Sequence, residues 1–189
     1  MESSLAKDQV SATSVTRPGL GEVVGAGGVY TVECRDADGN LKWVDSFNNL
    51  VVNEGLQDMN SKYFSGSSYT AALYLGLVTG PGSGTTFAAG NTLASHSGWT
   101  ENTAYIGNRK LATFGTATTA NPSVISNSGS ASVFTMNANS QTIAGAFLCT
   151  VDSGSSGILF SAGDFSGGDK LVDSGDTLSV TYTFSLTAT

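Results

Sequence analysis

The sequence contains one histidine, His96, which stands in a Ser/Gly-rich stretch at residues 95–98. A Ser-His-Asp triad would need a serine and an aspartate from elsewhere in the chain, and no motif around His96 indicates such partners. The chain also lacks a nucleophile elbow, a Walker loop and a glycine-rich dinucleotide motif. We therefore expect a loop histidine that hydrogen-bonds to its own backbone and a chain that is not an enzyme, with a hydrolase as a distant alternative.

Two groups of oxygen-bearing side chains have the residue types of a cation site. Residues 36–40 begin like a calcium loop, but Leu41 stands where glycine is needed and Phe47 stands where a bidentate glutamate belongs. The second group lies in glycine-rich turns and consists of Asp164, Asp169, Asp173 and Asp176. Carboxylates in such turns mostly cap the turn itself. We therefore predict turns at both places, and neither a metal nor a cofactor.

The two cysteines, Cys34 and Cys149, have no partner cysteines at the spacing of a zinc site. Both fall in strand patterns, on the face expected to meet the core. The first residues lack the apolar stretch of a signal peptide, so we expect synthesis in a cytoplasm, where thiols stay reduced. The prediction is two buried free thiols, with a disulfide as the rarer outcome.

A long connection at residues 85–108 contains turn residues and isolated aromatic residues. Loops of this length in compact domains are usually functional or packed on themselves. Trp99 is able to stack on a sugar ring, but a loop tryptophan more often anchors its loop to the domain. The candidate interaction loop consists of Phe87, His96, Trp99 and Tyr105.

The chain is acidic, with a formal net charge of −7 at pH 7 over 189 residues. Affinity for nucleic acid comes largely from Lys and Arg side chains that neutralise phosphates, and the one adjacent basic pair is Arg109 and Lys110. We therefore exclude a nucleic-acid partner. No run of about 18 apolar residues occurs, so neither a membrane span nor a membrane partner is expected. The length suits one domain.

Alternation of apolar and polar residues predicts strands through most of the chain. Residues 30–47 are predicted to form a hairpin that turns near Gly39, because Asp-Gly tolerates positive φ. Residues 53–64 are the one predicted helix, with Asn53 as N-cap. Its apolar face is predicted to consist of Leu56, Met59, Tyr63 and Phe64. Further strands are predicted at residues 71–78, 132–137, 142–151, 158–160 and 178–187.

These short strands and turns are typical of a single antiparallel β-sandwich, of jelly-roll or immunoglobulin-like topology. In the last strand the apolar residues face one way, whereas serines and threonines face water or a neighbouring chain. We expect it to be an edge strand that adds to a neighbour's sheet. Residues 1–28 are polar and aperiodic, which predicts an extended, flexible N-terminal arm, and residues 29–189 form the sandwich.

Several segments of the predicted sandwich together resemble a group of virion structural proteins of tailed bacteriophages, described both as head decoration and as tail-fibre-like proteins. The segments are residues 30–43, 49–52, 72–77, 92–101, 144–148 and 174–182. The resemblance covers most of residues 29–189 and not the arm. It implies an assembled virion component with no known catalysis, and it supplies no active-site residues.

Two features favour capsid decoration over a place at the tail tip. An arm of about 25 residues extends up to about 80 Å, enough to lie across adjacent capsid subunits. An acidic, Ser/Thr-rich surface keeps particles dispersed. We expect a decoration or cement protein on the outer surface of the virion capsid, bound to the major capsid protein and to other copies of itself, with a trimer as one arrangement. The predicted arm contacts are Val10, Val15, Arg17, Pro18 and Leu20.

The alternative function is a receptor- or carbohydrate-binding module of a tail fibre. In that case His96, Trp99 and Tyr105 would present a site to a glycan of the host surface. Binding of the isolated domain to such a glycan would distinguish the two functions.

Overall fold

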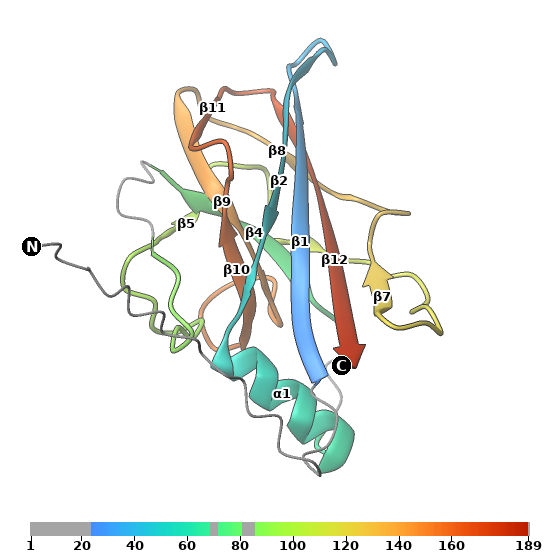
Figure 1. The fold of residues 1–189 in the computed structure, drawn as a ribbon. Helices are drawn as coiled ribbons and strands as arrows, with labels where there is room; N and C mark the ends of the chain where they lie inside the picture. The colour runs from blue at the N-terminus through green and yellow to red at the C-terminus, as the bar shows by residue number, and fades with distance from the viewer. Residues whose placement is uncertain (1–23, 69–71, 81–85, 189) are drawn as a thin grey trace, which may run out of the picture.

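The computed structural model describes residues 24–68, 72–80 and 86–188. Within these ranges the chain folds into two antiparallel sheets packed face to face, with one short helix at an end of the sandwich (Figure 1). The predicted all-β sandwich is therefore confirmed. The predicted arm contacts Val10, Val15, Arg17, Pro18 and Leu20 lie outside the described residues.

The first sheet has two long strands at its centre. Its members are β1 (Val24–Arg35), β2 (Leu41–Asn48), β7 (Ser123–Ser126), β8 (Ser132–Thr135) and β12 (Thr177–Ala188). β1 pairs with β12 over its whole length, and β2 pairs with the other side of β1. β7 and β8 pair one after the other along the remaining side of β12.

The second sheet is built around β9. Its members are β3 (Leu50–Val51), β4 (Tyr74–Thr79), β5 (Glu101–Asn102), β6 (Lys110–Leu111), β9 (Gln141–Cys149), β10 (Leu159–Asp164) and β11 (Lys170–Val172). β9 pairs with β4, β10 and β11. β3 then pairs with β10, whereas β5 and β6 pair with β4.

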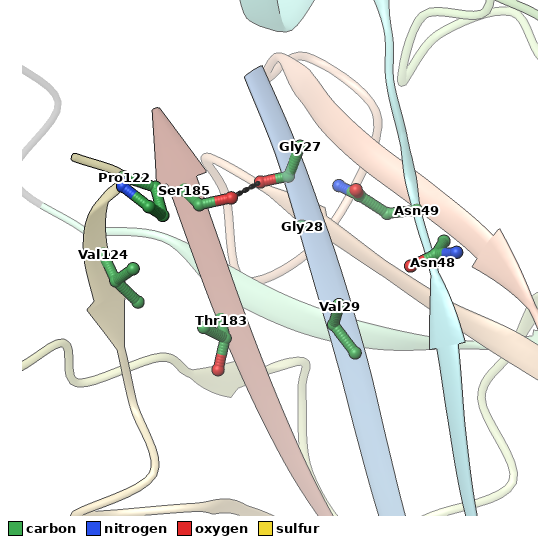
Figure 2. A pocket seen from close by; sticks show the side chains of 9 residues that line it. All are labelled: Gly27, Gly28, Val29, Asn48, Asn49, Pro122, Val124, Thr183 and Ser185. Carbon is green, nitrogen blue, oxygen red and sulfur yellow. Dashed lines mark hydrogen bonds between the residues drawn. The ribbon is translucent and has the colours of Figure 1, made fainter. Parts of the chain in front are cut away.

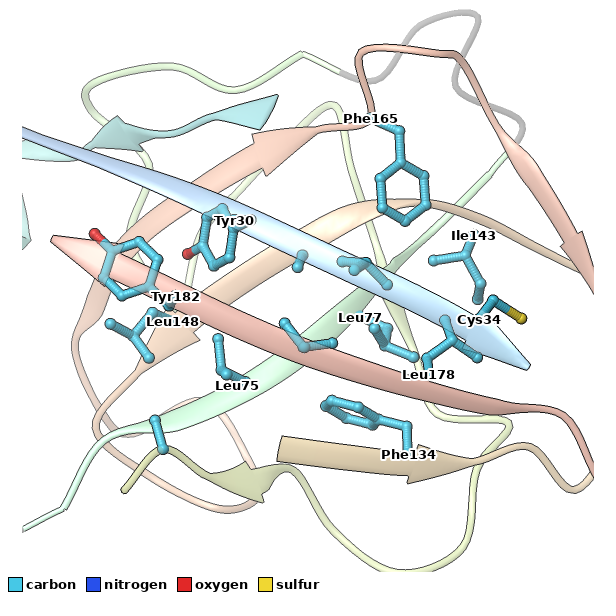
Figure 3. Packing of buried hydrophobic residues seen from close by; sticks show 14 of the residues in the cluster. Tyr30, Cys34, Leu75, Leu77, Phe134, Ile143, Leu148, Phe165, Leu178 and Tyr182 are labelled. Carbon is cyan, nitrogen blue, oxygen red and sulfur yellow. The ribbon is translucent and has the colours of Figure 1, made fainter. Parts of the chain in front are cut away.

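The core lies between the two sheets and is filled by alternate residues of their strands (Figure 3). Each large apolar side chain buried in this way contributes roughly 1.5–3 kcal/mol to folding. The fully buried side chains of the central strands include Tyr30, Val32, Leu75, Leu77, Ile143, Leu148, Leu178, Val180 and Tyr182. The period of two in β1 and β12 therefore places one face of each strand in the core, as predicted.

A chain of hydrogen bonds crosses the core and joins the sheets. The hydroxyl of Tyr30 lies 2.7 Å from Oγ of Ser161, whose hydroxyl donates to the Tyr182 oxygen over 3.4 Å. Asn49 donates to the same Tyr182 oxygen over 2.8 Å. Buried hydroxyls without partners are costly, so this chain of bonds allows two tyrosines to extend across an otherwise apolar core.

The predicted start of the sandwich at residue 29 was too late. β1 begins at Val24, and its first five residues pair with β12. Residues 24–28 are glycine-rich and show no alternation, so their strand conformation comes from the ladder that β12 provides. Glycine is required at Gly28, because a Cβ there would lie 2.5 Å from the Tyr182 hydroxyl oxygen.

The predicted helix is confirmed in extent, since α1 spans Asn53–Phe64. Met59 packs against the core as expected, but the predicted cap and the packing of the helix end were wrong. The N-cap residue is Val52, and no side chain caps the helix. Tyr63 and Phe64, expected to pack on the core, are 84% and 79% exposed. The residue that α1 buries is Gly55. The apolar pattern predicted the helix, but it did not indicate which side meets the sheets.

The expected position of the last strand at a sheet edge was also wrong. β12 is interior, because β1 covers one side and β7 and β8 cover the other. The predicted hairpin of β1 and β2 is confirmed, with Gly39 at a φ of 87° in its turn. It is β2 that forms an edge of this sheet.

Candidate functional site

Trp99 anchors the long connection to the second sheet. Its buried ring lies 5.2 Å from the ring of Phe147 on β9 and 5.6 Å from that of Phe87, centroid to centroid. Its indole nitrogen donates to Oδ1 of Asn91 over 3.1 Å. The anchoring interpretation of Trp99 is therefore confirmed, because the ring is covered and its polar atom has a partner.

His96 packs on this same tryptophan. The two rings stack with centroids 3.8 Å apart, and Nδ1 of His96 lies 3.1 Å from the carbonyl oxygen of Trp99. This is the predicted contact of a loop histidine with nearby backbone. The imidazole is thus engaged with a ring and a carbonyl of its own loop, and its visible role is to stabilise that loop.

Tyr105 is buried next to an ion pair. Its ring packs against Phe134, and its hydroxyl donates to Glu101 over 3.4 Å. Glu101 in turn accepts two hydrogen bonds from the guanidinium of Arg109, at 2.8 and 2.7 Å. Burial, followed by the charge of Glu101, raises the pKa of Tyr105. The alternative function expected Trp99 and Tyr105 to present a site to a glycan. Both side chains are buried, so this expectation was wrong.

Asp36 and Asp176, two of the aspartates with the residue type of cation ligands, accept hydrogen bonds within turns, as predicted. Oδ1 of Asp36 accepts from the backbone amides of Asp38 and Asn40. Asp176 accepts from the amide of Asp173 over 2.8 Å and from Nζ of Lys42 over 2.6 Å. Among the described residues, no group of three or more His, Cys, Asp or Glu side chains is arranged to hold a metal ion.

Both cysteines are buried and unpaired, as the sequence predicted. Burial, followed by the nearby charge of Asp176, raises the pKa of Cys34 to about 11. Burial also raises the pKa of Cys149, whose thiol donates to the carbonyl of Val151 over 3.2 Å. A raised pKa keeps a thiol protonated and therefore a poor nucleophile.

A groove of about 510 Å³ opens on the first sheet, away from the core (Figure 2). Its residues come from the start of β1, the ends of β2 and β12, and the region of β7. They are Gly27, Gly28, Val29, Asn48, Asn49, Pro122, Val124, Thr183 and Ser185. None of these side chains is ionisable, so the groove offers amides and hydroxyls for hydrogen bonding and supplies no general acid or base.

The groove belongs to a larger surface, here called the outer face, on the solvent side of β1, β2 and β12. Three cross-strand rows form it: Thr183 with Val29 and Asn48, Thr181 with Thr31 and Ser46, and Ser179 with Glu33 and Val44. The hydroxyls of Thr31 and Ser46 lie 2.9 Å apart, which confirms that they share a side. Glu33 is the one charge in these rows, and it pairs with Arg35 at 2.6 Å.

Sequence reasoning predicted the polar side of the last strand but not the whole outer face. The alternation within each strand was visible, whereas the pairing of β1 with a strand about 150 residues away is a property of the fold.

The described part of the chain contains no helix long and apolar enough to cross a membrane.

No protein-family model, curated protein or solved structure matches this chain. The resemblance to phage virion proteins therefore stays a prediction from the sequence. In the structure its segments include parts of β1, β2, β4, β9 and β12 and the loop of Trp99. They are mostly core strands together with the loop that packs on them, so the resemblance concerns the framework of the sandwich.

Proposed function

We propose that this chain is a bacteriophage virion structural protein that decorates the capsid, binding the outer capsid surface and stabilising the head. The observation that carries this proposal is the outer face. The centres of protein–protein interfaces are depleted of charged residues, because charges are costly to remove from water. Rows of Ser, Thr and Val on a rigid sheet meet this requirement, with one charge that is already paired.

The charge distribution of the whole chain also supports the proposal. A net charge of −7 opposes non-specific aggregation of free copies in solution. The outer face is nearly free of those charges, so contact with a capsid protein there buries few of them. The resemblance of the framework segments to virion proteins points in the same direction.

Purified protein should be mixed with capsids that lack it and imaged by cryo-electron microscopy. We expect regular density on the capsid lattice, with the outer face turned towards the shell. Density at the tail alone would favour a tail-fibre module, and particles without added density would remove the decoration role.

A substitution in the outer face tests the orientation. Thr181→Arg places a charge in the middle row, so we expect capsid binding, measured by co-sedimentation, to weaken at least tenfold. Ser155→Arg, in an exposed turn between β9 and β10, is the matched control and should bind like the parent. Equal binding of both variants would show that the outer face is not the surface that contacts the capsid.

Deletion of residues 1–21 tests the arm in the same assay, and unchanged occupancy of the capsid would exclude the arm as a contact.

A further inference from the structure

β2 is a long strand with one open side. In the described sheets it pairs with β1 alone and has eight residues, whereas the outermost strands of the second sheet, β3 and β5, have two each. The amide of Asn49 donates to the carbonyl of Gly28, so the odd-numbered residues of β2 direct their backbone groups towards β1. The backbone groups of the even-numbered residues, Lys42 to Asn48, therefore lie in the plane of the sheet and point away from β1, towards the open edge.

An edge strand of this length usually carries a device that prevents further pairing. β2 has a register shift at one end, opposite Cys34 and Arg35. Its inward charge, Asp45, is held by the turn at Ser166 and Gly167 and so does not obstruct the plane of the sheet. Leu41 and Val44 on β2 are 54% and 51% exposed. The edge thus offers hydrogen-bonding groups together with apolar side chains.

We propose that two copies of this chain join through their β2 strands, antiparallel and about a two-fold axis at Val44. Directly opposite residues of paired strands have their side chains on the same face, so the two-fold axis passes at a residue. The two residues nearest the midpoint of β2 are Val44 and Asp45. An axis at Asp45 would set two carboxylates directly opposite one another, which is destabilising. An axis at Val44 sets Val44 opposite its own copy, Lys42 opposite Ser46 and Trp43 opposite Asp45. No like charges then meet.

This pairing joins two five-stranded sheets into one and continues the outer face across both copies. The inference concerns β2 and does not rest on the capsid role. It replaces the expected pairing through the last strand, whose two sides are occupied within the sheet.

Single cysteine substitutions test the register. Residues opposite one another in a hydrogen-bonded pair have Cα atoms about 5.5 Å apart, within the range that a disulfide spans. Under mild oxidation we expect Val44→Cys to form a covalent dimer, because the new thiol meets its own copy. The native Cys34 and Cys149 are buried and do not compete. Ser46→Cys is the matched control and should stay monomeric alone, but it should cross-link with chains that carry Lys42→Cys.

Sedimentation velocity of the full chain, from low micromolar to millimolar concentration, measures the association itself. We expect a monomer–dimer equilibrium that Val44→Lys weakens at least tenfold, because two like charges then face each other at the axis. Thr181→Lys, interior to the same face, should leave the equilibrium unchanged. Urea unfolding of each variant verifies that it is folded. A monomer at every concentration, a trimer, or self-cross-linking of Ser46→Cys would overturn the proposal. If Thr181→Arg weakens capsid binding while dimers persist, the capsid contact and the β2 dimer are independent of one another.

Discussion

Asp45 is a buried carboxylate that fastens β2 to the turn between β10 and β11. It accepts from the amide and hydroxyl of Ser166 and from the amide of Gly167, and Nζ of Lys170 lies 3.4 Å away. Burial alone would raise its pKa. The hydrogen bond from the Ser166 hydroxyl, then those from the two amides, outweigh burial and hold the pKa of Asp45 below its usual value.

We predict that Asp45→Asn lowers the free energy of unfolding by about 1–3 kcal/mol at neutral pH, because it removes a charged acceptor from buried donors. A depressed pKa stabilises the fold above the unfolded value, about pH 4, and that contribution is lost as the pH falls through the folded value. Urea unfolding of parent and variant should therefore converge in acid. Asp38→Asn, in the exposed turn, serves as control. A difference that stays constant with pH would show that the charge of Asp45 is not responsible.

The helix α1 approaches β10 closely at Gly55, a residue without a side chain. A Cβ on Gly55 would collide with the carbonyl oxygen of Phe160, and Glu54 accepts a hydrogen bond from the amide of Leu159 over 2.7 Å. Alanine normally stabilises a helix by about 1 kcal/mol relative to glycine. Here the collision opposes that gain.

We therefore predict that Gly55→Ala destabilises the protein by about 1–2 kcal/mol in urea unfolding, since overpacking costs about 1–3 kcal/mol. Asn60→Ala, on an exposed position of the same helix, should instead stabilise it by up to about 0.7 kcal/mol. Two substitutions to alanine in one helix thus have opposite signs. If both stabilise, the close approach of α1 to β10 is not maintained in solution.

The positions of α1 and of the longer strands were predictable because each depends on local periodicity, whereas the sequence did not predict the short strands β3, β5, β6, β7 and β11. The N-terminal part of β1 was not, since residues 24–28 carry no pattern and pair only because β12 lies beside them. The packed state of Trp99 was expected from its residue type, whereas the ion pair of Arg109 with Glu101 was missed. Arg109 was visible only as half of a basic pair, and its partner is set by how the long connection folds back.

The core contains the buried tyrosines Tyr30, Tyr105 and Tyr182. Burial raises the pKa of Tyr30, Tyr105 and Tyr182, with the neighbouring Tyr182 adding to the shift of Tyr30 and Glu101 to that of Tyr105. A raised pKa means that the folded state keeps its protons at a pH where the unfolded state releases them. The stabilisation that these tyrosines contribute is therefore fully present below about pH 10 and is lost as the pH rises through their folded-state pKa values.

We predict a cooperative alkaline unfolding in which these three tyrosines ionise together with the loss of the sheets. Tyrosinate absorbance and circular dichroism, recorded in one pH titration, should change at a common midpoint. Tyr63→Phe removes an exposed ionisable hydroxyl and should leave that midpoint unchanged. Gradual ionisation of the three tyrosines while the sheets persist would contradict the prediction.

The pairing of β1 with β12 makes the order of synthesis matter. The ribosome synthesises β1 about 150 residues before its partner, and β7 and β8 also cannot pair until β12 has been made. Until residues 177–188 have emerged, the nascent chain exposes the apolar side of its first hairpin and has no central strand on which to close. Contacts so distant in sequence make folding slow, and unpaired strands attract other chains meanwhile. A chaperone that shields that hairpin during synthesis would therefore raise the yield of folded protein more than a gain in final stability would.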